Sequence, residues 1–129
     1  MTLRLLDAAV LVRANGVVLT YNVDGELPQL GSQLFSTTFI DGSGSVIRQL
    51  GFKFVEGGLA AAFSFDHISA MQRNYPTAPT RVSNRYTIVF ALDALGGATA
   101  GTWHADLDVD GQDGGRIEGT FEQTPALAE

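Results

Sequence analysis

Apolar and polar residues alternate with a period of two along much of the chain, in short runs rich in Val, Ile, Phe, Tyr and Thr. This alternation is typical of strands that bury one face. Turn signals such as Asn15-Gly16 and Asp24-Gly25 separate the runs at fairly even intervals, which indicates an all-β sandwich or barrel. The runs predict eight strands, at 8–14, 17–23, 33–40, 46–55, 59–65, 81–92, 99–110 and 116–123.

Eight antiparallel strands favour a single closed β-barrel, because closure removes unpaired sheet edges and leaves room inside for one small ligand. A two-sheet β-sandwich is the alternative. One short helix is expected near 66–74, where Phe65 and Ile68 recur at helical spacing and Asp66 can cap the first turn. The loop at 75–80 contains two prolines and is a candidate lid over one barrel mouth.

The length of 129 residues allows one hydrophobic core. We expect a single domain over 1–124 and a C-terminal tail at 125–129. No apolar run approaches the roughly 18 residues that a membrane-spanning helix needs, and the N-terminal stretch lacks the pattern of an export signal. The sequence therefore predicts a cytoplasmic protein, and a homodimer is expected because two-fold dimers are common.

Charge and composition exclude several function classes. The chain carries 14 acidic and 8 basic residues, for a net charge of −6. Such a surface repels phosphate backbones and anionic lipids, so neither nucleic acid nor a membrane is an expected partner. The chain has no cysteine, and it has no nucleotide-binding glycine loop and no Gly-x-Ser-x-Gly nucleophile motif. We therefore predict no metal and no cofactor.

One acidic segment resembles the beginning of a calcium loop. Asp106, Asp108, Asp110 and Asp113 alternate with other residues and surround a glycine. The twelfth position of such a loop requires a bidentate glutamate, but Ile117 stands there. An acidic strand that ends in an Asp/Gly turn is the preferred interpretation, and calcium binding stays an alternative.

Alternation also assigns side chains to faces. Trp103 and Leu107 are predicted to point inward and His104 outward. In the expected hairpin, Leu107 lies opposite Ile117, and Trp103 lies opposite Phe121. The inferred interior is aromatic, which suits a pocket for a mostly apolar molecule, although plain core packing explains the same pattern. The predicted ligand-binding residues are Tyr21, Phe52, Phe54, Phe63, Phe65, Phe90 and Trp103.

Three residues of this interior are candidates for catalysis. Arg48 faces inward near a strand end, where it should meet a carboxylate or bind a ligand oxygen. His67 extends the aromatic face and titrates near neutrality, which suits a general acid or base, although a hydrogen-bonded strand-end histidine is the alternative. Tyr86 offers one polar tip on an apolar body.

The segment 31–54 contains a glycine, a strand that ends at Asp41-Gly42, and a second strand with Gly51 in its middle. It resembles the hairpin of small calycin-like barrels of the allene oxide cyclase and dirigent type, which include the bacterial polyketide barrel cyclases that act as Diels–Alderases. The resemblance implies a cofactor-free pocket that folds a flexible apolar substrate into a reactive shape.

Three functions are therefore carried forward. The first is a cofactor-independent cyclase or isomerase in natural-product, polyketide-like biosynthesis, which would act by conformational templating in an aromatic barrel pocket. The second is a non-catalytic, lipocalin-like carrier of a hydrophobic ligand. The third is a structural or interaction domain whose β surface mediates assembly.

Overall fold

The chain folds into antiparallel strands throughout the part that the computed structural model describes, residues 3–123. The prediction of an all-β protein is confirmed. Among residues 3–123, no helix is long and apolar enough to cross a membrane. The predicted tail at 125–129 lies outside the described residues.

The elements are β1 (Leu5–Arg13), β2 (Gly16–Val23), β3 (Ser32–Asp41), β4 (Ile47–Val55), β5 (Gly58–Asp66), β6 (Met71–Tyr75), β7 (Thr80–Val82), β8 (Arg85–Phe90), the 3-10 helix η1 (Leu92–Leu95), β9 (Ala100–Val109) and β10 (Gln112–Glu122).

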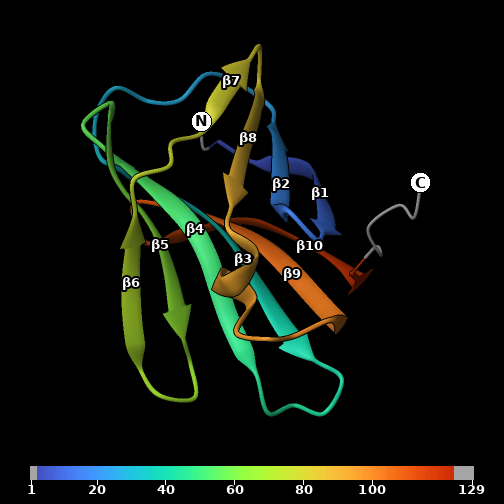
Figure 1. The fold of residues 1–129 in the computed structure, drawn as a ribbon. Coiled ribbons are helices and arrows are strands. Elements are labelled where there is room, and N and C mark those ends of the chain that lie inside the picture. The colour runs from blue at the N-terminus through green and yellow to red at the C-terminus, as the bar shows by residue number, and fades with distance from the viewer. Residues whose placement is uncertain (1–2, 124–129) are drawn as a thin grey trace.

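The strands form two packed sheets. The smaller sheet has the order β1-β2-β8-β7, and the larger has the order β10-β9-β3-β4-β5-β6. Figure 1 shows β8 and β2 crossing one face of the larger sheet. Neither sheet closes into the predicted barrel, and the two-sheet alternative fits the arrangement. The backbone of β10 approaches β1 at Gly115 and Leu5, but both strands carry register shifts near this point, so no ladder joins the sheets there.

The segment 66–74 forms a turn and a strand in place of the predicted helix. Asp66 does cap one turn, because its carboxylate accepts hydrogen bonds from the backbone N–H groups of Ile68 and Ser69. Ala70 then adopts a left-handed conformation with φ of 60°, which ends the turn after a single hydrogen bond from its N–H to the Asp66 carbonyl. The chain continues as β6, which pairs with β5.

Strand pairing corrects two details of the predicted register. The hairpin of β9 and β10 exists, but Ile117 lies opposite Ala105, and Trp103 lies opposite Gly119. The pairing is displaced because the chain reverses in a tight turn at Asp110 and Gly111, so that Gln112 already lies opposite Val109. A bulge between Asp113 and Arg116 adds one residue to β10 and makes up only part of the difference from the predicted register. The predicted strand 81–92 is divided differently, since a turn at 83–84 separates β7 from β8 and η1 begins at Leu92.

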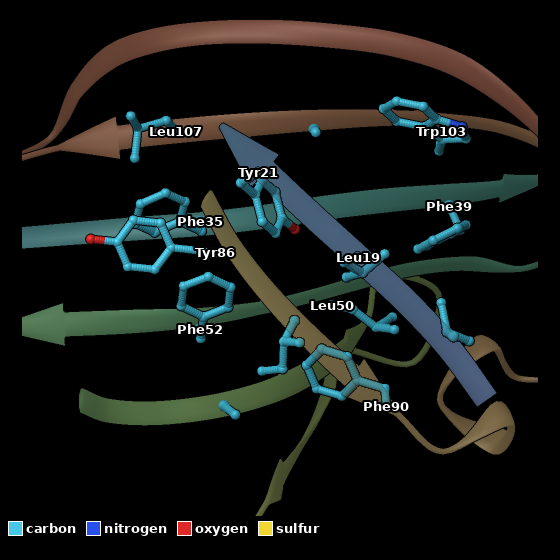
Figure 2. Packing of buried hydrophobic residues seen from close by; sticks show 14 of the residues in the cluster. Leu19, Tyr21, Phe35, Phe39, Leu50, Phe52, Tyr86, Phe90, Trp103 and Leu107 are labelled. Carbon is cyan, nitrogen blue, oxygen red and sulfur yellow. The ribbon is translucent and has the colours of Figure 1, made fainter. Parts of the chain in front are cut away.

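The core lies between the sheets and is filled by aromatic rings. Phe35 and Phe52 stack with their ring centroids 4.9 Å apart, and Tyr21 and Tyr86 pack against Phe35 from the smaller sheet. Figure 2 shows these rings between β2 and β8 on one side and β3 and β4 on the other. Trp103 and Leu107 are buried, as alternation predicts. The aromatic interior is therefore a packed core.

Phe63 and Phe65 do not face this core, contrary to the prediction. They lie opposite Gly51 and Gln49 of β4, on the outer face of the larger sheet. The inward positions of β5 belong to Ala62 and Ser64, both of them buried. Small residues fit there because Phe52, directly across from Ala62, fills the space between the sheets.

Candidate functional site

The three predicted catalytic residues lie in three different places. Arg48 and His67 lie close to the start of β4, on opposite faces of the larger sheet, whereas Tyr86 lies on β8 at the other end of the molecule, next to Phe54. No catalytic centre combines them.

Arg48 has a structural partner. Its Nη2 lies 3.4 Å from an oxygen of Asp66, which is one of the two outcomes that the sequence predicted for an inward arginine. Its Nη1 donates a hydrogen bond of 3.3 Å to the carbonyl of Ala94 in η1. The guanidinium also covers Gly96, where a Cβ atom would lie 2.7 Å from Cζ of Arg48. Arg48 therefore anchors η1 to the larger sheet.

The Asp66 carboxylate should titrate below the ordinary value of 3.8. Hydrogen bonds from Ile68 and Ser69, and more weakly the charge of Arg48, lower its pKa. Since the folded pKa lies below the unfolded one, ionised Asp66 stabilises the fold above pH 3.8, and this stabilisation disappears as the pH falls through the folded pKa. An NMR titration of the Asp66 side chain should report the lowered pKa. A value at or above 3.8 would contradict the capped turn.

His67 lies on the outer face of the larger sheet, just after β5, and is exposed. Its backbone N–H donates to the carbonyl of Ile47. Its ring packs edge-on against Phe65, and Nε2 lies 3.1 Å from Oε1 of Gln49. The prediction that His67 and His104 face opposite sides is wrong, because both line one groove across this outer face.

Four predicted ligand-binding residues are parts of the core. Tyr21, Phe52 and Phe90 are fully buried, and Trp103 nearly so. The Tyr21 hydroxyl pairs with Thr37 Oγ1 at 2.6 Å, and burial raises the pKa of this phenol. The Trp103 Nε1–H donates to the Thr120 carbonyl within its own hairpin. Their polar atoms are thus used within the fold, which is the packing alternative considered for them.

Phe54 and Tyr86 line a cavity of about 550 Å³ at one end of the two sheets. We call it the end pocket. Leu27 and Leu59 add apolar surface, and the loop between β2 and β3 brings Glu26 to the rim. The volume lies within the range of small-molecule sites. Ala78 and Pro79 also line it, so the loop predicted as a lid does border a cavity.

The Tyr86 hydroxyl is the polar atom of interest in this pocket. The side chain is almost fully buried, and its oxygen has no hydrogen-bond partner among the described residues. Burial raises the pKa of Tyr86 and the charge of Arg81 opposes the rise, so the phenol is a protonated donor at neutral pH. An unpaired buried hydroxyl is costly in a folded protein unless a ligand or water completes it.

Arg81 is a site residue that the sequence analysis missed. Its guanidinium lies 5.7 Å from the centre of the Tyr86 ring, and its Nε donates a hydrogen bond of 2.7 Å to the carbonyl of Ser83. The 83–84 turn therefore positions a cation over the aromatic floor of the end pocket. A turn predicted at 83–84, within the predicted strand 81–92, would have indicated this position of Arg81.

The carboxylates of the calcium-like segment contact groups of the protein itself. Asp106 binds His104 and Arg116, each at 2.7 Å. Asp108 and Asp110 accept backbone N–H groups of Gly111 and Ser32. Within residues 3–123 there is no cluster of three or more His, Cys, Asp or Glu residues able to hold a metal ion. The acidic turn thus uses its oxygens to order loops.

Comparison with known proteins adds no relative from which a function could be transferred. No protein-family model matches the chain, and no curated protein sequence matches it significantly. The likeness of 31–54 to allene oxide cyclase and dirigent barrels stays a prediction, and the end pocket is the geometry on which a function can be argued.

Proposed function

We propose that the protein binds a small, mostly apolar molecule in the end pocket and holds it by one hydrogen-bond acceptor. The observation that carries this proposal is the buried hydroxyl of Tyr86, which has no hydrogen-bond partner within residues 3–123 and lies in a cavity lined by Phe54, Leu27 and Leu59. Such pockets combine an apolar lining with a few polar groups that fix the ligand's orientation. A carbonyl, enolate or carboxylate oxygen is the complement of a phenol donor.

The positive charge of Arg81 further restricts the chemical class of the ligand. A guanidinium beside the phenol favours an oxygen that carries full or partial negative charge. Glu26 on the rim opposes a ligand with negative charge at several points. The ligand is therefore an apolar molecule with a single acidic or strongly polarised oxygen at one end.

Conversion of this ligand is the second candidate function. The phenol of Tyr86 and the guanidinium of Arg81 would polarise a bound carbonyl, and the apolar walls would hold a flexible chain in one shape. This is the chemistry of a cofactor-free cyclase or isomerase, as predicted for polyketide-like substrates. Native mass spectrometry of the purified protein, followed by identification of any extracted ligand before and after incubation, separates conversion from carriage.

The Tyr86→Phe variant tests the binding site. With 8-anilinonaphthalene-1-sulfonate as the probe, we expect binding about five- to tenfold weaker than in the unchanged protein, since one hydrogen bond of about 1 kcal/mol is lost. Fluorescence titration measures the affinity. Tyr75→Phe is the matched control, because Tyr75 loses a hydroxyl that contacts Ser64 and does not line the end pocket. Equal affinity of Tyr86→Phe and the unchanged protein would overturn the assignment.

The homodimer and the cytoplasmic location stay predictions. The proposal for the end pocket needs neither of them, because one chain supplies all the lining residues described here. Sedimentation of the purified protein measures the subunit number directly.

A further inference from the structure

The outer face of the larger sheet, away from the end pocket, carries a groove of about 860 Å³. Its floor is formed by β3, where Ser36 and Thr38 point away from the core and are nevertheless only 3% and 8% exposed. Its sides carry Gln49 from β4, His104 and Asp106 from β9, and His67, which follows β5. We call it the outer groove.

The polar groups of the outer groove are arranged in register across three strands, β4, β3 and β9. Thr38 of β3 lies directly between Gln49 of β4 and His104 of β9. In the next row, Ser36 lies beside Asp106. Side chains directly opposite one another on a sheet face are close neighbours, so these hydroxyl, amide, imidazole and carboxylate groups form a continuous polar strip.

Hydrogen bonds inside the strip hold its members in place. Asp106 accepts from Nε of Arg116 on one oxygen and pairs with Nδ1 of His104 on the other, each at 2.7 Å. An ionised carboxylate can only accept, so Nδ1 of His104 is the donor in this pair and the imidazole ring is held in one orientation. Gln49 is similarly oriented by Nε2 of His67 at 3.1 Å. A strip of fixed donors and acceptors is suited to hydroxyl recognition.

Apolar side chains border the polar strip. Ile40 and Ile47 lie opposite each other on β3 and β4, and Leu34 lies at the other end of the groove. A ligand for this surface therefore presents several hydroxyl groups together with apolar C–H faces. Sugar rings have this combination, and an open groove accepts a chain of them.

The charge of the outer groove indicates which class of sugar it can bind. The guanidinium that lines the outer groove, Arg116, is already paired with Asp106. Asp108 and Asp113 line the same groove, and the chain has a net charge of −6. Sulfated or phosphorylated ligands would meet the negative charge of these two aspartates, and Nε of Arg116 is engaged with Asp106. We propose that the outer groove binds a neutral oligosaccharide chain, independently of any ligand in the end pocket.

The test is an NMR titration of the full chain with three neutral hexasaccharides, cellohexaose, xylohexaose and maltohexaose, and with a sulfated heparin hexasaccharide. At least one neutral sugar should shift the amide signals of Ser36, Thr38 and Gln49, and the heparin fragment should bind more weakly. No binding of any neutral sugar at about 10 mM, well above a millimolar dissociation constant, overturns the proposal. Shifts confined to Phe54 and Tyr86 overturn it as well.

Thr38→Val provides the matched variant. It removes one hydroxyl from the groove floor with little change in volume, so we expect the fold to persist and sugar binding to weaken about five- to tenfold. Thr20→Val makes the same change on the outer face of the smaller sheet, on β2, and should leave binding unaltered. Equal affinities of the two variants would overturn the assignment of the ligand to the outer groove.

Discussion

Replacing Phe35 with alanine is expected to lower the free energy of unfolding by about 3–5 kcal/mol. Phe35 is fully buried at the centre of the core, where it stacks on Phe52 and contacts Tyr21 and Tyr86. Alanine leaves a cavity that rings from both sheets cannot close without losing their own contacts. A domain of this size has only about 5–15 kcal/mol of stability, so the variant should be close to unfolding at moderate temperature.

Denaturant unfolding measures the loss, followed by fluorescence of Trp103, the single tryptophan, which is buried. Phe65→Ala is the control, because Phe65 lies half-buried on the outer face and touches the ring of His67. Its loss should be about 1 kcal/mol, as expected for exposing part of a phenylalanine surface. Similar losses for the two variants would contradict the assignment of Phe65 to the outer face.

Gly51→Ala should also destabilise the protein, by about 1–3 kcal/mol. Gly51 lies opposite Ser36 in the middle of the larger sheet. A Cβ atom there would collide with the Phe35 carbonyl and would lie 3.0 Å from Cα of Ser36. Backbone of a central strand cannot move aside as a flexible side chain can, so β3 and β4 would have to separate.

The control for Gly51 is Gly58→Ala. At Gly58 the nearest atom to a new Cβ is the Val55 carbonyl oxygen at 3.8 Å, an ordinary contact. Alanine also restricts the unfolded chain, so this variant should be neutral or slightly more stable. Thermal unfolding of both variants makes the comparison. A Gly51→Ala protein as stable as Gly58→Ala would show that the two strands are less closely packed than described here.

The buried face of β9 was predictable because charged side chains occupy only the opposite face of the strand. His104, Asp106 and Asp108 alternate with Trp103 and Leu107, and only one face of such a strand can be buried. The same rule failed in β5, where neither alternating set carries a charge before Asp66 at the end of the strand. There the cross-strand partner decides, since Phe52 leaves room opposite itself only for a residue as small as Ala62.

The candidate site was only partly predictable for a related reason. Periodicity shows that a side chain points inward, but it does not show whether the interior retains empty space. Tyr21 and Tyr86 both occupy inward positions and lie directly opposite each other on β2 and β8. The Tyr21 hydroxyl nevertheless forms a hydrogen bond with Thr37, whereas the Tyr86 hydroxyl has no partner among the described residues. The turn that brings Arg81 to the end pocket is set by 83–84, where Ser83 adopts a positive φ of 56°, an uncommon choice for serine.

The order of strands within the two sheets has a consequence for how the protein is made. β3 pairs with β4 on one side and with the much later β9 on the other, and β2 likewise pairs with β1 and with β8. A chain leaving the ribosome therefore displays two unpaired strand edges until the segment from β8 to β10 has been synthesised. Local pairs such as β1-β2 and β3-β4 need no later segment, but neither sheet reaches its full width before that moment. Folding is therefore completed late in translation, and the open edges of β2 and β3 are exposed to aggregation until then.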